Sequence, residues 1–457
     1  MSDTARILLA APNSGTGKTT ITLALLAALV KRGASPVAFK CGPDYIDPMF
    51  HREVLGIPSY NLDRFFTDSE TVCGLLSEHA KGHDIAVIEG VMGYYDGVNY
   101  GLQASSYELA QTIAAPVVLV VSAKAAALSL AALIKGFSEF KSPSHIVGVI
   151  LNDCSEILYN RLKAKLSAET GLPMLGHFPR LPECAIESRH LGLVTSAEIT
   201  DLRQKLIKLG QQAEQSLEID ALLKLARAAP PVYGKLPHIE KVTTAKPVIA
   251  VAKDNAFCFY YADNLALLRL LGAQIAEFSP LHDKALPEGT SGLYLGGGYP
   301  ELYAKTLSEN TAMLEDVRKA VLGGMPTIAE CGGFLYLHNT LEDDSGISYS
   351  MAGKHSPVLP GQGYKTARLQ RFGYINLMAM RENAFLPVGE SMPAHEFHYW
   401  NSTLKGASCK ATKPDGRTWE CVSASSNLFA GFPHLYFYSH PAFAARFVKA
   451  AAGFGGY

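Results

Sequence analysis

Short apolar segments alternate with helical patterns along the first part of the chain, and this alternation restricts the fold more than any other feature. Five of these segments are apolar enough to be strands that are buried on both faces: 7–11, 36–40, 85–89, 117–121 and 146–151. Strands of this kind are typical of a parallel sheet covered by helices. Residues 19–32 predict the first helix, which ends after the basic Lys31 and Arg32, at Gly33. The sequence therefore predicts an α/β fold.

The pattern divides the chain into three parts. Residues 1–195 hold the first alternation, which we expect to form one domain. Residues 196–245 are polar and helical and end in a Pro-rich stretch, which is typical of a connector. A second alternation of strands and helices starts at 247–252 and continues through a strand expected at 292–298. We therefore predict a second α/β domain at 246–457.

The composition favours a globular protein that binds neither nucleic acid nor membranes. Of the 457 residues, 48% are hydrophobic and 18% are charged, which is enough apolar material for a large core. There are 41 Lys and Arg against 42 Asp and Glu, and a net charge of −1 provides no field that attracts DNA or an anionic membrane. The longest apolar stretch, 113–134, is interrupted by Pro116 and Lys124, which favours a buried strand followed by a helix over a membrane span.

The cysteines and the first residues indicate a cytoplasmic protein. The eight cysteines are dispersed and form no Cys-x-x-Cys pair, and the apolar run within 1–15 is too short for a secretory signal. Free thiols in a reducing compartment therefore fit the pattern better than disulfides do. The sequence does not indicate an oligomeric state.

A glycine-rich turn between the first expected strand and helix has the form of a P-loop. The segment PNSGTGKTT at 12–20 follows the strand and leads into the helix. In such a loop, backbone N–H groups and the helix N-terminus bind phosphate, the lysine contacts the outer phosphates, and the next hydroxyl binds Mg²⁺. Pro12 stands where the usual motif begins with glycine, and an ordinary glycine-rich turn is the alternative. The residues expected to bind a nucleotide are Gly15, Gly17, Lys18, Thr19 and Thr20.

Charged residues follow the second and third of the expected strands. Lys40, Asp44 and Asp47 leave the second strand, and Glu89 ends the third. Ligands of open α/β sheets lie beyond the carboxyl ends of the strands, so we expect these side chains to lie near the phosphate loop. The three carboxylates, together with Thr19, can complete a Mg²⁺ shell, and Lys40 can neutralise charge that develops during phosphoryl transfer. The alternative is that the aspartates only cap the turns at the strand ends.

The second domain contains a candidate nucleophile. Cys331 stands where an expected strand at 326–330 changes to a helical pattern through two glycines, the first of which is Gly332. A nucleophile in such a tight turn is exposed, and we expect the helix N-terminus to lower its pKa. The N–H groups of Gly297 and Gly298, at the end of a neighbouring strand, are expected to stabilise an oxyanion together with that of Gly332. A buried core cysteine is the alternative.

The base that such a cysteine requires is expected among the histidines late in the chain. The segment FPHLYFYSH at 432–440 offers His434 and His440. Either can take the proton of the thiol if it lies within hydrogen-bond reach. The residue types alone do not decide between them.

Both halves of the chain resemble one family, the glutamine-dependent a,c-diamide synthases of corrinoid biosynthesis. The resemblance covers nearly the whole chain and rests on ten motifs in the family's order: SGTGKTT, FKCGPDYIDPMFH, NLDRFF, VIEGVMGYYDG, GVILND, RHLGLV, FCFYYADNL, GLYLGGGYPELYA, AECGGFLYL and HEFHY. It implies an N-terminal P-loop domain with a parallel sheet, similar to dethiobiotin synthetase. It also implies a C-terminal α/β domain of the class I glutamine amidotransferase type.

On the ATP side, the resemblance places Lys18 and Thr19 on the phosphates of ATP and on Mg²⁺. The residues that line the ATP site are then Lys40, Asp44, Asp47 and Glu89. The family converts the a and c carboxylates of a tetrapyrrole ring to amides, using an acyl phosphate made from ATP and ammonia released from glutamine. Arg189 and His190 are candidates for contacts with the ring.

On the glutaminase side, Cys331 matches the nucleophile that forms the glutamyl thioester. The segment FPHLYF aligns with the family's Tyr-x-His-x-His-Phe pattern, which selects His434 over His440 as the base. The first Tyr and the second His of that pattern are Phe432 and Tyr436 here. Many class I glutaminases carry a glutamate where Tyr436 stands. We therefore expect a Cys–His dyad that lacks the usual orienting carboxylate.

Other P-loop proteins match less well. A partitioning-type ATPase switch carries a second lysine where Asn13 stands, and it has no use for Cys331. Cobyric acid synthase shares both domain types but differs after the second strand, and dethiobiotin synthesis alone leaves 246–457 unexplained. Related enzymes amidate hydrogenobyrinate or nickel-sirohydrochlorin with nearly the same motifs. Cobyrinate is the expected substrate, and these two macrocycles are the alternatives.

Overall fold

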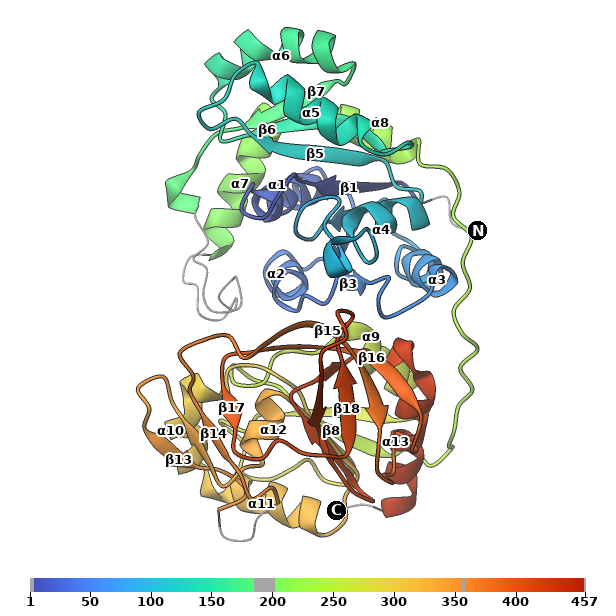
Figure 1. The fold of residues 1–457 in the computed structure, drawn as a ribbon, viewed down its shortest axis with the longest axis vertical. Helices are drawn as coiled ribbons and strands as arrows, with labels where there is room; N and C mark the ends of the chain where they lie inside the picture. Colours follow the sequence, from blue (N-terminus) through green and yellow to red (C-terminus); the bar gives the residue numbers. More distant parts are fainter. Residues whose placement is uncertain (1–3, 185–201, 355–357, 456–457) are drawn as a thin grey trace. The chain divides into compact units, whose positions relative to one another are not determined.

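The computed structural model describes residues 4–184, 202–354 and 358–455. The chain forms two compact units, Met1–Pro237 and His238–Tyr457 (Figure 1). The boundary between the units falls inside the predicted connector at 196–245, and the two helices of that segment belong to the first unit. The domain limits at 195 and 245 stay a prediction.

The first unit is built on a seven-stranded sheet in the order β3-β2-β4-β1-β5-β6-β7. All of its neighbouring strands run parallel. The strands are β1 (Arg6–Ala10), β2 (Pro36–Cys41), β3 (Ser59–Leu62), β4 (Ile85–Glu89), β5 (Val117–Ser122), β6 (Ile146–Asn152) and β7 (Met174–Phe178). Every residue of β1, β2 and β4 is buried, which agrees with apolar runs covered on both faces. The predicted α/β class with a parallel sheet is confirmed.

Helices connect the parallel strands of this sheet. They are α1 (Lys18–Lys31), α2 (Ile46–Leu55), α3 (Ser69–His79), α4 (Ser106–Thr112), α5 (Ser129–Glu139) and α6 (Glu156–Thr170), with short 3₁₀ turns η1 (Val98–Tyr100) and η2 (Pro182–Cys184). Two more helices follow, α7 (Leu202–Ser216) and α8 (Ile219–Arg227). Figure 1 shows α7 beside α1, and a Cβ on Gly210 of α7 would lie only 2.9 Å from Cβ of Ala27. Glycine therefore permits the close contact of these two helices.

The second unit contains a six-stranded sheet in the order β20-β21-β11-β10-β8-β9. Its strands are β8 (Val248–Ala252), β9 (Gln274–Phe278), β10 (Thr290–Leu295), β11 (Thr327–Glu330), β20 (Ser423–Ala424) and β21 (Leu428–Gly431). All pairs are parallel except β20 with β21. Its helices are α9 (Ala262–Leu270), α10 (Ala304–Glu309), α11 (Thr311–Leu322), α12 (Gly332–Tyr336) and α13 (Pro441–Phe454), with turns η4 (Pro300–Tyr303) and η5 (Phe437–Ser439).

Two smaller sheets of the second unit were not expected from the sequence. One has the order β13-β12-β14-β17 and the other β19-β18-β15-β16-β22. Their strands are β12 (Thr340–Glu342), β13 (Ser348–Ser350), β14 (Gln362–Tyr364), β15 (Arg371–Ala379), β16 (Ser391–His398), β17 (Asn401–Ser402), β18 (Cys409–Thr412), β19 (Thr418–Cys421) and β22 (His434–Leu435). The short strand β22 pairs antiparallel with β16, which sets His434 opposite His395. The last sheet thus positions the predicted base.

Candidate functional site

The phosphate loop joins β1 to α1 and is shaped by two glycines. Gly15 and Gly17 have positive φ angles of 77° and 98°, a region that side chains disfavour. A Cβ on Gly17 would also lie 2.2 Å from Nδ2 of Asn152, at the end of β6. The Asn152 amide donates a 2.8 Å hydrogen bond to the carbonyl of Thr16. Asn152 therefore holds the loop from a distant strand, a role that sequence reasoning missed.

Lys18 follows the loop as the first residue of α1. Its ammonium donates to the carbonyl of Met92 at 2.6 Å and to that of Asn13 at 3.3 Å. Burial, and then the neighbouring Lys40 charge, lower the pKa of Lys18 to about 8. The carbonyl oxygens that hold this ammonium carry no formal charge, and an anion would favour its protonated form, so its surroundings fit a phosphate group.

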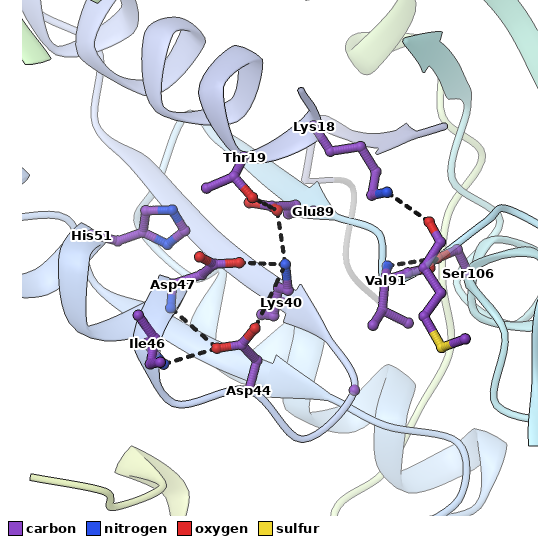
Figure 2. Close-up of polar contacts among 12 residues, drawn as sticks. Lys18, Thr19, Lys40, Asp44, Ile46, Asp47, His51, Glu89, Val91 and Ser106 are labelled. Atoms are coloured by element: carbon purple, nitrogen blue, oxygen red, sulfur yellow. Dashed lines mark hydrogen bonds and ion pairs between the residues drawn. The ribbon is translucent and has the colours of Figure 1, made fainter. Parts of the chain in front are cut away.

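Lys40, at the end of β2, is the centre of a cluster of carboxylates (Figure 2). Its ammonium binds the carboxylate of Asp47, lies 2.7 Å from Oε1 of Glu89 and lies 3.9 Å from Oδ2 of Asp44. Lys40 and Glu89 are paired residues of the adjacent strands β2 and β4. The predicted convergence of these four residues is thus present in the described structure, although which of them bind ATP or a metal stays a prediction.

The charges of this cluster depend on one another. Burial opposes the charge of Lys40, but the carboxylates of Asp47, Glu89 and Asp44 outweigh it and raise the pKa of the amine well above its ordinary value. Burial and the neighbouring Asp47 raise the pKa of Glu89 to about 7 and that of Asp44 to about 6. Burial also acts to raise the pKa of Asp47, but the charge of Lys40 outweighs burial, and the pKa of Asp47 is lowered. Three carboxylates face a single ammonium, so a further cation is electrostatically favoured here.

Thr19 and Glu89 have the donor atoms that Mg²⁺ prefers. The Thr19 hydroxyl, at the start of α1, donates to Oε1 of Glu89 at 2.6 Å. The other oxygen of Glu89 is buried and has no hydrogen-bond partner among the described residues. Over the same ranges, no group of three His, Cys, Asp or Glu side chains is arranged as a preformed metal site. Mg²⁺ commonly takes only one or two protein oxygens beside phosphate and water, so this pair fits the ion.

Cys331 occupies a strained turn between β11 and α12. Its φ of 47° lies in the left-handed region, which is rare for a residue with a side chain, and its N–H donates to the carbonyl of Gly431 at 2.7 Å. The start of α12 packs closely against the end of β10, since a Cβ on Gly333 would lie 2.2 Å from the carbonyl oxygen of Leu295. A strand, a strained nucleophile and a helix in this order are typical of a nucleophile elbow.

The surroundings of Cys331 raise its pKa, whereas the sequence led us to expect a lowered one. Burial acts first, and the carboxylate of Glu301 adds to it. The N–H of Gly332 bonds to the sulfur and opposes the rise, but α12 is only five residues long. All eight cysteines are free thiols. The expected effect of the helix is therefore outweighed, and Cys331 requires a base to ionise it.

His434 lies on β22 beside the glycine loop that follows β10. A Cβ on Gly297 would lie 2.6 Å from Cε1 of His434, so glycine provides the room for the ring. The ring stacks on His395 at a centroid distance of 4.9 Å. Burial, with His395 and His398 nearby, lowers the pKa of His434 well below its ordinary value. A neutral imidazole can accept a proton from a thiol.

A carboxylate lies next to His434, contrary to the expectation of a dyad without one. Oε2 of Glu330, the last residue of β11, is 3.9 Å from Nδ1 of His434. Tyr436, which stands where many class I glutaminases carry a glutamate, instead donates to Asp263 at 2.9 Å. Sequence reasoning missed Glu330, although it directly precedes Cys331 in the motif AECGG.

The other predicted residues have different surroundings. Gly298 follows Gly297, and a Cβ on Gly332 would lie 3.2 Å from the Gly298 nitrogen, which brings two of the three predicted oxyanion donors together. Nε2 of His440 lies 2.8 Å from Oε2 of Glu390. Arg189 and His190 lie outside the described residues. Their contact with a ring stays a prediction.

No helix in the described ranges is long and apolar enough to cross a membrane.

Two family models match the chain. The CobQ/CobB/MinD/ParA nucleotide binding domain matches residues 7–194, and the CobB/CobQ-like glutamine amidotransferase domain matches residues 248–442. The first of these models therefore includes the phosphate loop, and the second includes the Cys331 turn.

Curated proteins similar to this chain match it over nearly its whole length. A cobyrinate a,c-diamide synthase of Caldanaerobacter subterraneus is 39% identical over 98% of this chain and 98% of its own. Another protein with that name, from Salmonella typhimurium, is 40% identical over 97% of each chain. A third, from Listeria innocua, is 38% identical over 96% of this chain and 97% of its own.

Proposed function

The chain belongs to the family of the cobyrinate a,c-diamide synthases, and from this premise we propose that it amidates the a and c carboxylates of cobyrinate in cobalamin biosynthesis, with ATP and glutamine. It is a glutamine-dependent amide-forming ligase with a nucleotide-binding domain. The observation that carries the proposal is that one chain combines two features. In one, Thr19 of the phosphate loop and Lys40 share an oxygen of Glu89, and in the other, a strained Cys331 directly follows a glutamate that lies 3.9 Å from His434.

The ATP half activates the carboxylate. A carboxylate does not accept ammonia at neutral pH until one of its oxygens becomes a leaving group. We propose that this oxygen attacks the γ-phosphorus of ATP, which forms an acyl phosphate and releases ADP. Lys18 holds the phosphates, and Lys40 offsets the charge that develops on the transferred group. Thr19 and Glu89 would hold Mg²⁺, which supplies charge neutralisation at the phosphates when it is bound.

The glutaminase half releases ammonia. The proton of the Cys331 thiol moves to His434 as the sulfur bonds to the side-chain carbonyl carbon of glutamine. The N–H groups of Gly297, Gly298 and Gly332 stabilise the negative oxygen, which the closeness of Gly332 to the Gly298 nitrogen supports. The imidazolium then gives its proton to the amide nitrogen, the C–N bond breaks, and ammonia leaves. Water hydrolyses the thioester to glutamate and restores the thiol.

The ammonia then attacks the acyl phosphate and displaces phosphate, which leaves the amide. We propose that it is used without release, because free ammonia at neutral pH is mostly protonated and no longer a nucleophile. Two rounds convert carboxylates c and a. The dispersed free thiols support a cytoplasmic location, and the partners proposed are the small-molecule substrates alone.

The test uses the purified full chain with ATP, Mg²⁺ and glutamine. Cobyrinate, hydrogenobyrinate and nickel-sirohydrochlorin are supplied in separate reactions, and the products are identified by mass spectrometry. We expect two amides to form on cobyrinate, with the highest kcat/KM for this ring. A higher kcat/KM for either of the other rings would assign the chain to that macrocycle, and no amide on any ring would contradict the proposal.

A further inference from the structure

Glu330 is a buried carboxylate that the mechanism above does not use. It ends β11 directly before the nucleophile, and its Oε2 lies 3.9 Å from Nδ1 of His434. The side chains of both residues are almost fully buried, with 2% and 3% exposed. A carboxylate withdrawn from water loses hydration free energy, so a carboxylate in this place needs a partner that bears or develops positive charge.

The two oxygens of Glu330 have different surroundings. Oε1 accepts hydrogen bonds from the Tyr294 hydroxyl at 3.2 Å and from the N–H of Leu435 at 3.4 Å. Oε2 is buried and has no hydrogen-bond partner among the described residues. Leu435 directly follows His434, so the bond to Oε1 ties the carboxylate to the strand that carries the imidazole. The carboxylate is therefore held in place by one oxygen and presents the other to Nδ1.

We propose that Glu330 is the positioning residue of the glutaminase site: it accepts a hydrogen bond from Nδ1–H of His434 and so leaves Nε2 as the base for the Cys331 thiol. This inference rests on the proposed function. When the thiol proton moves to Nε2 and sulfur bonds to the glutamine carbonyl carbon, the ring becomes an imidazolium whose charge faces the carboxylate. The proton then goes to the leaving nitrogen, and Glu330 gains or loses no proton in the cycle.

The charge of the Glu330 carboxylate can stabilise the imidazolium form of His434. Burial and the rings of His395 and His398, both on β16, disfavour a charged His434. An ionised Glu330 is the group placed to offset that cost while the imidazolium exists. Tyr436, two residues after His434, donates to Asp263, so the carboxylate beside the imidazole is the one from β11.

The ionisation of Glu330 predicts a pH dependence. Burial raises the pKa of Glu330 to about 8. Among the described residues, the titratable groups near Glu330 include Tyr260, Tyr294 and Cys331, and those near His434 include His395 and His398. A carboxylate with a raised pKa is ionised only above that pKa. Glutamine hydrolysis should therefore increase as the pH rises through about 8.

The experiment measures glutamine hydrolysis in Glu330→Gln and Glu330→Asp across this pH range. The side chain introduced by Glu330→Gln keeps an oxygen that can accept from Tyr294 and Leu435. It presents only an uncharged amide group to Nδ1 of His434. We expect kcat of Glu330→Gln to fall by about 10²-fold or more with KM nearly unchanged, and the rise near pH 8 to disappear. Glu330→Asp keeps the charge and should recover part of kcat together with the rise.

Two controls separate positioning from structural damage and from failure of the proposed function. Tyr436→Phe removes a buried hydrogen bond from the same segment and should hydrolyse glutamine at close to the native rate. Ammonia-supported amidation of cobyrinate reports on the ATP half, and its absence in the native enzyme would refute the proposed function rather than this inference. Native kcat and pH profile in Glu330→Gln would overturn the inference. If that variant does not fold, the measurement relies on Glu330→Asp. A rate of glutamine hydrolysis that rises with pH in this variant supports the proposal, and a rate that does not change with pH overturns it.

Discussion

Lys40 and Glu89 are paired residues at the carboxyl ends of adjacent parallel strands, and the Lys40 ammonium lies 2.7 Å from Oε1 of Glu89. Thr19 donates to the same oxygen from the first turn of α1. One carboxylate therefore links the phosphate loop to the lysine of the charged cluster. A change at either residue should act on both the metal requirement and the transfer chemistry, but in different proportions.

Replacing Glu89 with glutamine should raise the Mg²⁺ requirement of amide formation. The change keeps the size of the side chain but removes a negative charge beside the Thr19 hydroxyl, so we expect the half-saturating Mg²⁺ concentration to increase by about tenfold or more. Glutamine hydrolysis should remain measurable. Glu78→Gln, which changes an exposed glutamate paired with Lys81, is the control. An unchanged Mg²⁺ titration and full amidation in Glu89→Gln would remove this residue from the site.

Replacing Lys40 with methionine should slow amide formation and also destabilise the first unit. The variant leaves the buried carboxylates of Asp47 and Glu89 without their cation, and removal of one partner of a buried ion pair typically costs about 3–5 kcal/mol. Without Lys40 the folded-state pKa values of both carboxylates rise, so stability should fall as the pH increases from 5.5 to 8. Denaturant unfolding of both proteins at several pH values measures this. A deficit that is equal at all pH values would contradict the account.

The two late histidines should differ in their effect on glutaminase. His434→Ala removes the imidazole beside Glu330, and loss of a general base typically costs about 10²–10⁴-fold in kcat. His440→Ala removes a side chain paired with Glu390 and should keep most of the activity. Steady-state glutamine hydrolysis by both folded variants gives the ranking. A greater loss in His440→Ala would show that the histidines were assigned in the wrong order.

The sequence predicted the fold best where strands are buried on both faces. The strands β1, β2, β4, β5 and β6 lie where continuous apolar runs indicated them. The edge strands β3 and β7 were missed, because SYNL and MLGHF have no such run. The two smaller sheets of the second unit were missed for the same reason: their strands are short or only half-buried, so polar and apolar residues mix.

The candidate site was predictable where it depends on strand order. Lys40, Asp47 and Glu89 meet because the ends of adjacent parallel strands lie at one edge of the sheet. Asn152 contacts Thr16 from 136 residues away in the chain, and no local pattern indicates that pairing. Glu330 points to His434 only because β21 lies next to β11, which the spacing of residues does not reveal.

The central claim is that Cys331 supplies ammonia to a carboxylate that is activated by the separate ATP half. Cys331→Ser keeps the turn but replaces the thiol by a much weaker nucleophile. We measure diamide formed from cobyrinate with ATP and Mg²⁺, with either glutamine or ammonium salt as nitrogen source, and verify folding by thermal unfolding. The account predicts that glutamine-supported amidation falls by about 10³-fold or more, while ammonia-supported amidation stays within about twofold of native. Loss of both activities in a folded variant, or full activity with glutamine, would contradict it.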